Sequence, residues 1–269
     1  MPVINTNTNA AYAQDALKVN SKVMSSAMQQ LATGSRINQA RDDAAGLSIG
    51  MNMTSQVRGL NQAVRNVNDG INLLQTADGG LVETSNMLQR MRELAVQSSN
   101  GTNSTSQRIY LNNEFASLTT EINRIASGTT WNNSNLYGTS LVFQAGMNSG
   151  NLISITMSAM DAVTIGISTT ATISTFTGSQ AAITSLDSAI DTVNSARSTM
   201  GAVMNQLSYS ADNLTNISTN IAASRSSVMD TDYATASATL SKSQIVQQAA
   251  TAMLAQANQQ PQSVLSLIK

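Results

Sequence analysis

A seven-residue repeat near the C-terminal end constrains the fold more than any other feature of the sequence. Apolar residues occupy every seventh position of a stretch without proline, at Leu186, Val193, Met200, Leu207, Leu214, Ile221 and Val228. A repeat of about 3.5 residues is typical of a helix whose narrow apolar seam packs against another helix. The pattern therefore predicts one long helix over 181–228.

A matching seam lies in the first half of the chain. It consists of Val57, Leu60, Val64, Val67, Ile71, Leu74, Leu81 and Leu88. It predicts a helix over 44–98, on the order of 80 Å long at 1.5 Å per residue, capped by Asp42 or Asp43. The seam is interrupted at Asp78-Gly79-Gly80, where we expect a bend or a local exposure. The interruption is either a tolerated surface irregularity or a functional hinge.

Composition excludes several classes of protein. Aromatic residues make up 3% and charged residues 11% of the chain, and the net charge is −1, so nucleic acid and anionic lipid are not expected partners. The chain has neither cysteine nor histidine, which removes disulfides, the commonest general base and the commonest metal ligand. No segment approaches the roughly 20 apolar residues of a membrane span. We expect a non-catalytic helical protein with no cofactor, no bound metal and no membrane insertion.

The remaining segments complete a mainly α fold. Helices are predicted over 5–33, ended by Gly34, over 106–126, packed antiparallel to the second helix, and over 231–259, ended by Pro261. A β-hairpin region is predicted over 130–180, with strands at 141–146 and 152–157. The predicted architecture is a long helical rod: the terminal helices pair as a coiled coil, and an antiparallel helical bundle carries the small hairpin region. The apolar C-terminal end is best explained by burial in an assembly.

Short motifs at both ends of the sequence occur in a specific order and spacing. They lie at 3–7, 34–38, 42–46, 68–71, 88–97, 230–234, 247–249, 254–258 and 261–267. Together they resemble those of bacterial flagellin over nearly the whole length. Only about twenty residues separate Met157 from Ala181, where many flagellins insert outer domains, so the chain resembles a minimal flagellin without large outer domains.

This resemblance implies a domain organisation and a function. It implies an inner terminal-helix domain of 1–43 with 229–269, and a rod domain of 44–228. The expected function is a structural subunit that polymerises with copies of itself into the flagellar filament for motility. The expected location is extracellular, after export without a cleaved Sec signal. Expected partners are the export apparatus, a secretion chaperone, the filament cap and hook-associated proteins. The alternative is a hook–filament junction adaptor, which shares the terminal helices.

The terminal helices are the expected assembly elements. Their apolar stripe is too thin to stabilise an isolated helix pair, so we expect them to fold on polymerisation. The residues assigned to inner-domain assembly are Ile4, Leu17, Met24, Leu31, Leu240, Val246, Leu254, Val264, Leu265, Leu267 and Ile268.

The resemblance also implies a surface on the helices of 44–98 and 106–126. In flagellins that activate the flagellin-sensing Toll-like receptor, matching residues contact the receptor and are buried between subunits. The corresponding residues are Gln89, Arg90, Leu94, Gln97 and Glu114. A competing interpretation is that Arg90 and Glu114 form an ordinary solvated ion pair, worth under about 1 kcal/mol. We expect subunit packing to be the first role of this surface.

Overall fold

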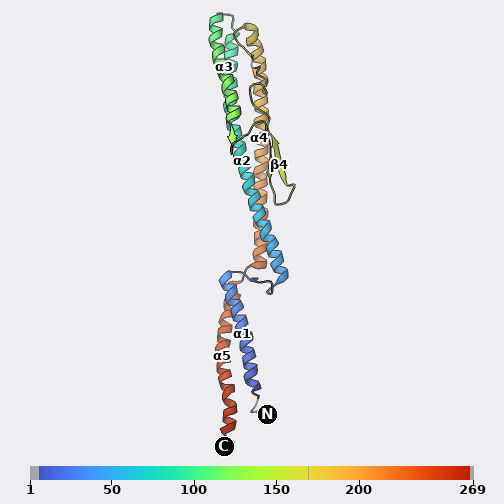
Figure 1. Cartoon of the computed structure of the whole chain (residues 1–269), viewed down its shortest axis with the longest axis vertical. Helices are drawn as coiled ribbons and strands as arrows, with labels where there is room; N and C mark the ends of the chain where they lie inside the picture. The colour runs from blue at the N-terminus through green and yellow to red at the C-terminus, as the bar shows by residue number, and fades with distance from the viewer. Residues whose placement is uncertain (1–5, 169, 267–269) are drawn as a thin grey trace. The chain divides into compact units, whose positions relative to one another are not determined.

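The computed structural model describes residues 6–168 and 170–266 and is mainly helical, which confirms the predicted fold class. Its elements, in order, are α1 (Thr8–Thr33), α2 (Ala44–Ser98), α3 (Thr105–Gly128), β1 (Thr130–Trp131), β2 (Ser134–Asn135), β3 (Ser140–Gln144), β4 (Leu152–Thr156), α4 (Phe176–Met229) and α5 (Tyr233–Ser266) (Figure 1). The protein divides into two compact units, Met1–Val57 with Asn220–Lys269, and Arg58–Thr219. The domain limits expected from the resemblance, at 43/44 and 228/229, stay a prediction.

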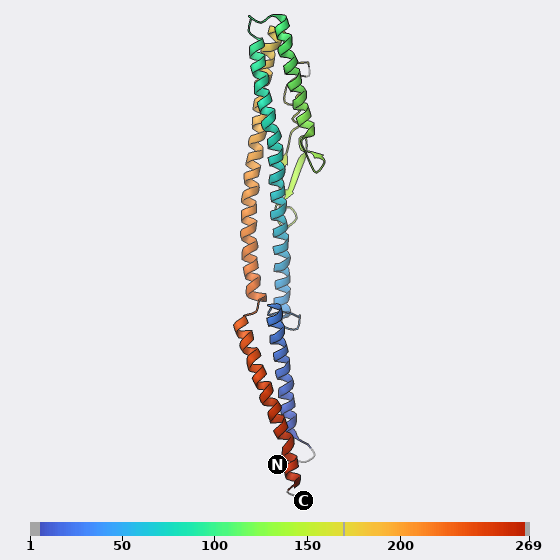
Figure 2. The same cartoon turned by 90° about the vertical axis from the view of Figure 1, so that its left-hand side faces the viewer.

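The second unit is built on the α2–α4 pair, whose helices lie side by side in both views (Figures 1 and 2). The predicted seam residues are fully buried along much of the pair, including Leu74, Leu81 and Leu88 on α2 and Leu186, Met200 and Leu207 on α4. Three polar pairs join the helices: Asn61 with Ser218, Asp78 with Arg197, and Arg92 with Asp187. Residue numbers rise along α2 as they fall along α4, so the two helices are antiparallel.

The third helix of this unit packs against α2 as predicted. It begins with a capping box, in which the Ser104 hydroxyl accepts from the Gln107 amide N–H and the Gln107 side chain accepts from the Ser104 N–H. Phe115 and Ile122 point into the core and are essentially unexposed. The helix is slightly longer than expected because it continues to Gly128 before the backbone turns into β1.

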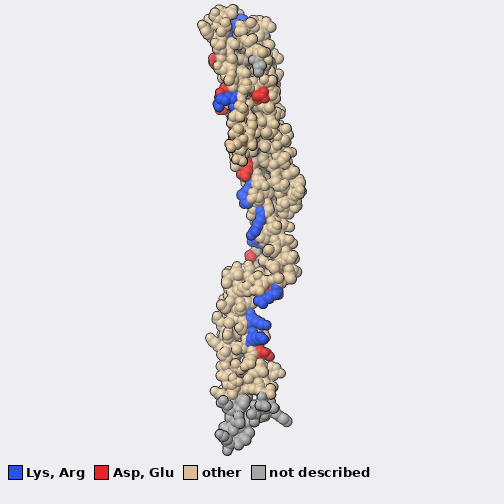
Figure 3. Space-filling model, viewed as in Figure 1, with Lys and Arg blue, Asp and Glu red and all other residues tan. Residues whose placement is uncertain are grey.

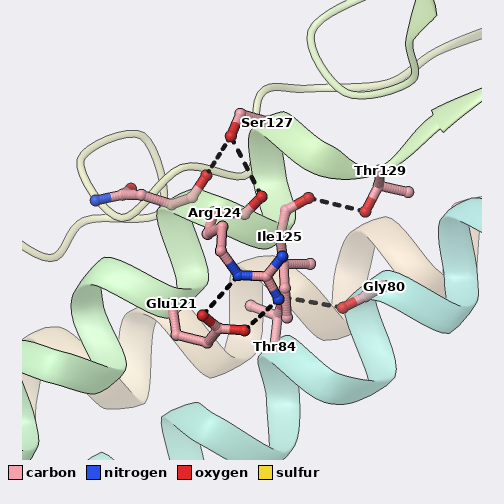
Figure 4. A network of polar contacts seen from close by, with 8 residues as sticks. Gly80, Thr84, Glu121, Arg124, Ile125, Ser127 and Thr129 are labelled. Atoms are coloured by element: carbon pink, nitrogen blue, oxygen red, sulfur yellow. Dashed lines mark hydrogen bonds and ion pairs between the residues drawn. The ribbon is translucent and has the colours of Figure 1, made fainter. Parts of the chain in front are cut away.

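The glycines at 79 and 80 do not break α2, which runs without interruption through them. Gly79 is exposed, and a Cβ placed there would have no neighbour within 4 Å. A Cβ on Gly80 would lie 2.5 Å from the Tyr137 hydroxyl and 2.9 Å from Thr129 Oγ1, and Figure 4 shows Gly80 opposite Thr129. The local exposure expected here is present at Gly79, and α2 is not broken. Gly80 leaves room for the Tyr137 side chain, whose hydroxyl donates to the Ala77 carbonyl at 2.6 Å.

Two antiparallel hairpins follow α3 within the predicted β region. In the first, β1 and β2 are joined by Asn132 and Asn133, whose positive φ angles of 49° and 63° are those of a tight hairpin turn. In the second, β3 pairs with β4 so that Phe143 faces Ile153, which confirms the predicted hairpin. The sequence patterns did not predict the first hairpin, and its Asn-Asn pair is the signal that could have located it.

The first unit contains the terminal helix pair α1–α5, which is also antiparallel. The Asn20 side chain donates to the Ser243 carbonyl at 2.8 Å, and Asn7 Nδ2 donates to the Ala257 carbonyl at 2.8 Å. Gly34 ends α1 in the left-handed region, as its position predicted.

The segments that follow α1 and α4 pair with each other in this unit. The Arg36 amide donates to the Met229 carbonyl at 2.7 Å, and the Thr231 amide donates to the Gly34 carbonyl at 2.9 Å. Of the two candidate caps of α2, Asp43 fills the role, because its carboxylate accepts from the Gly46 amide. Asp232 caps α5 by accepting from the amides of Ala234 and Thr235, so that helix begins at Tyr233.

Two predicted ends of the terminal helices were wrong. Helix α1 begins at Thr8 rather than at residue 5, because Asn7 is its cap and accepts from the Ala10 amide. Helix α5 continues through Pro261 to Ser266. Proline fits the helical φ but has no N–H, so the carbonyl four residues earlier loses its usual donor. That carbonyl belongs to Ala257, and Asn7 Nδ2 supplies a donor in place of the missing one.

Candidate assembly surfaces

The interior of the α1–α5 pair is narrow and made of small residues. The buried residues between the helices are Ala10, Ala27, Ala236 and Ser243. Of the predicted assembly residues, Leu17, Met24, Leu31, Leu240 and Leu254 are partly buried, and Val246 is exposed. Ile4, Leu267 and Ile268 lie outside the described residues, and the side chains of Val264 and Leu265 are likewise not described. The apolar stripe between α1 and α5 is therefore narrow in the part of the chain that the structure describes.

The same pair leaves many large apolar side chains in solvent. They are Tyr12, Val19, Val23, Met28, Tyr233, Ile245, Val246 and Met253, with exposed fractions from 40% for Val246 to 77% for Tyr12. An open groove of about 620 Å³ runs beside Tyr12, Ala16, Val246 and Met253. An apolar groove and exposed apolar side chains of this kind are typical of an interaction site. The sequence patterns did not assign Val19, which stands outside the seven-residue row of Leu17, Met24 and Leu31, or Tyr233, which lies seven residues before Leu240 at the start of α5.

The second candidate surface lies on α2 and α3. Arg90 bridges the two helices, with Nε donating to Glu114 at 2.9 Å and Nη1 donating to Glu93 at 2.9 Å. The hydrogen bond to Glu114 is the main reason that the pKa of Arg90 is raised. The structure therefore brings together the ion pair expected between Arg90 and Glu114 and adds Glu93, which the resemblance did not include.

The other predicted residues of this surface have different positions. Gln89 and Gln97 are exposed and line a shallow hollow of about 510 Å³, together with Arg92, Glu93 and Val96. Leu94 is only 1% exposed and lies in the core of the second unit. Its side chain supports the surface from beneath.

Charged side chains are sparse on the face drawn in Figure 3, where they form small separate groups on a largely uncharged surface. Ion pairs form within one helix, as between Arg124 and Glu121 on α3 (Figure 4), and between helices, as between Arg92 and Asp187. Exposed pairs of this type contribute little to stability. Among residues 6–168 and 170–266, no cluster of three acidic residues could hold a metal ion, and no helix is long and apolar enough to cross a membrane.

Two family models match the sequence and cover most of it. Residues 4–140 match the bacterial flagellin N-terminal helical region, and residues 183–268 match the bacterial flagellin C-terminal helical region. Among curated proteins, the chain is 43% identical to a flagellin of Halalkalibacterium halodurans over 99% of this chain and 100% of that protein. It is 37% identical to the flagellar filament 33 kDa core protein of Treponema phagedenis, over 99% of this chain and 100% of that protein.

Solved structures agree with these matches. The crystal structure of Bacillus cereus flagellin is 33% identical, covers 60% of this chain and 94% of that chain, and has a TM-score of 0.51. A putative flagellar hook-associated protein from Vibrio parahaemolyticus has a TM-score of 0.60 at 13% identity, over 70% of this chain and 100% of that one, which shows a shared fold alone. From the matches to both helical regions and the full-length identity, we conclude that this chain, a small one without large outer domains, belongs to the bacterial flagellin family.

Proposed function

We propose that the α1–α5 pair is the main assembly element of this flagellin and that it completes its folding only when subunits polymerise. Membership in the family makes the chain a structural subunit of the flagellar filament and not an enzyme. The observation that carries the proposal is the contrast between the small buried interior of the pair and the eight large apolar side chains that it exposes.

The small buried interior limits the stability of the pair in a single subunit. Burying a large apolar side chain stabilises by about 1.5–3 kcal/mol, whereas an alanine contributes far less. An isolated helix pair whose fully buried interior is three alanines and a serine, flanked by leucines that are only partly buried, must overcome the entropy of ordering two helices of 26 and 34 residues. Neighbouring subunits that cover Tyr12, Ile245 and Met253 would offset that entropy at the moment of assembly.

Amide hydrogen exchange on monomers and filaments tests this proposal directly. In monomers at neutral pH, we expect amides of 8–33 and 233–259 to exchange rapidly, while amides of the α2–α4 pair within 58–219 stay protected as an internal control. In filaments both sets should be protected. Strong protection of the terminal helices in the monomer would overturn the proposal.

Seeded polymerisation gives a second test of the exposed apolar residues. Tyr12 and Tyr110 have similar exposure, 77% and 72%, but lie on α1 and α3. Tyr12→Ser should slow the growth of filaments from seeds more than Tyr110→Ser does, because only Tyr12 belongs to the proposed assembly element. Equal growth of the two variants would contradict the assignment.

We further propose that the subunit works outside the cell after export of the unfolded polypeptide. The partners on this route would be the export apparatus, a secretion chaperone, hook-associated proteins and the filament cap. A terminal pair that folds late would suit passage through a narrow channel. The junction-adaptor alternative is not favoured, because full-length identity is to flagellins and to a filament core protein.

The surface around Arg90, Gln89, Gln97 and Glu114 is proposed to pack between subunits and, secondarily, to be recognised by the flagellin-sensing Toll-like receptor. Exposure of the Arg90–Glu114 bridge between two rigid helices supports this proposal. Arg90→Ala should lower receptor activation by monomers, whereas Arg124→Ala, which breaks a comparable exposed pair on α3, serves as the matched control. Full activation by the Arg90 variant would argue against it.

A further inference from the structure

The exposed turn between α2 and α3 contains the one asparagine in the sequence that is followed by glycine, Asn100-Gly101. Both residues are exposed. A Cβ built on Gly101 would meet nothing within 4 Å. The turn is therefore open to solvent at both residues.

The side chain of Asn100 is folded over the peptide bond that follows it. Its Oδ1 accepts from the Thr102 amide at 3.2 Å, an Asx turn that brings Cγ toward the Gly101 nitrogen. Within the described part of the protein, the Gly101 N–H donates to no hydrogen-bond partner, whereas the neighbouring amides of Asn100 and Asn103 are bonded. In the described part of the protein, the Gly101 nitrogen that would attack is thus not held by a hydrogen bond, and the Asn100 side chain that it would attack is held in an Asx turn over the same segment.

We propose that Asn100 is a site of spontaneous deamidation through a cyclic imide. The Gly101 nitrogen loses its proton to solvent base and bonds to Asn100 Cγ, while the C–N bond of the asparagine amide breaks and its nitrogen leaves as ammonia. Water then adds to one of the two imide carbonyls and opens the ring. The products are aspartate or isoaspartate at residue 100, with one amide nitrogen exchanged for one oxygen and no redox change.

Other residues of the protein provide internal comparisons. Asp69-Gly70 and Asp78-Gly79 could form the same imide, but both pairs lie inside α2, where the helical conformation and its hydrogen bonds restrain the nitrogen that would attack. Asn148 is exposed in the β3–β4 turn, but serine follows it, and a side chain on the attacking residue hinders ring closure.

The product carboxylate would form next to a cation. Arg108 Nη2 already donates to the Asn100 carbonyl at 3.1 Å, and Arg108 Nε is buried without a hydrogen-bond partner in the described part of the structure. A negative charge at residue 100 is therefore placed where it is attracted. Because the net charge of the protein is only −1, this one event changes it to −2.

The test uses the purified full-length protein, incubated in mildly alkaline buffer and mapped by mass spectrometry over time. Trypsin releases the peptide 93–108, which also contains Asn103 as an unreacted reference. We expect the amide-to-acid mass change at residue 100, a rate that rises with pH, methylation of the product by an isoaspartyl methyltransferase, and a more acidic isoelectric band.

The matched control is Gly101→Ala, which the structure accommodates because the new Cβ meets no atom and the backbone is not left-handed. Conversion at residue 100 should become about tenfold slower in this variant, since the added methyl group crowds the attacking nitrogen and restricts the backbone. Conversion of Asn100 at the rate of Asn103 or Asn148, or an unchanged rate in Gly101→Ala, would overturn the proposal.

Discussion

Substituting alanine for each of the two adjacent glycines in α2 should change stability in opposite directions. Gly79→Ala adds a methyl group to open solvent, whereas Gly80→Ala adds it 2.5 Å from the Tyr137 hydroxyl and 2.9 Å from Thr129 Oγ1. Tyr137 is only 5% exposed, so its ring cannot simply swing into water. The same chemical change is therefore placed in two opposite environments one residue apart.

The magnitudes follow from the contacts. An alanine in a helix interior is worth about 1 kcal/mol more than a glycine, which is the expected gain for Gly79→Ala. For Gly80→Ala that gain is offset by overpacking, at about 1–3 kcal/mol, and by loss of the hydrogen bond from Tyr137 to Ala77, at about 1–3 kcal/mol for a buried hydroxyl left unpaired. We expect a net loss of about 3 kcal/mol for Gly80→Ala.

Urea unfolding followed by far-UV circular dichroism measures both effects. The midpoint should rise for Gly79→Ala and fall for Gly80→Ala, with unchanged slopes. A third variant locates the cause: in a Tyr137→Phe background, the cost of Gly80→Ala should shrink, because the atom nearest to the new methyl group is gone. If Gly80→Ala is as stabilising as Gly79→Ala, the assigned close approach is incorrect.

Three further predictions concern other contacts. Asn7→Asp keeps the capping oxygen but removes the donor to the Ala257 carbonyl, so the critical concentration for polymerisation should rise about fivefold, equivalent to about 1 kcal/mol; an unchanged value would show that this bond is not needed in the filament. Asp78→Ala and Arg197→Ala should each lower the free energy of unfolding by about 1–2 kcal/mol, whereas leucine at both positions should leave it nearly unchanged. If the losses of the two alanine variants simply add in a double-mutant cycle, Asp78 and Arg197 do not interact. Burial raises the pKa of Tyr137 to about 12 from 10.0. The stability that the neutral Tyr137 hydroxyl contributes is therefore complete below about pH 10 and is lost as the pH rises toward 12. Alkaline unfolding that is unaltered in Tyr137→Phe would contradict this pH dependence.

The elements that follow from local patterns were predicted well from the sequence. The seven-residue repeats located α2 and α4 because a helical seam needs only regular spacing along one segment. Gly34 and Asp43, one of the two aspartates proposed to cap α2, fixed helix ends for equally local reasons, through conformation and capping.

The features that escaped prediction depend on partners distant in the sequence. Helix α5 continues through Pro261, and the Ala257 carbonyl that the proline leaves without its usual donor accepts from Asn7, near the other terminus. Gly80 looked like an irregularity because its partner, Tyr137, lies beyond α3. The resemblance to flagellin motifs assigned Leu94 to the α2–α3 surface, but its side chain is buried in the core of the second unit. No periodicity within a single segment carries this information.

The antiparallel pairings also set an order in which contacts between distant segments can form. The cross-helix partners Arg92 and Asp187 are 95 residues apart in sequence, Asp78 and Arg197 are 119 apart, and Asn61 and Ser218 are 157 apart. Closing a 250-residue loop directly, as the bond from Asn7 to Ala257 would require, costs about 0.9 kcal/mol more entropy than closing one of 95 residues. Folding is thus expected to begin near Arg92 and Asp187 and to extend pair by pair toward the two termini, so that shortening either terminus removes only the contacts that form last.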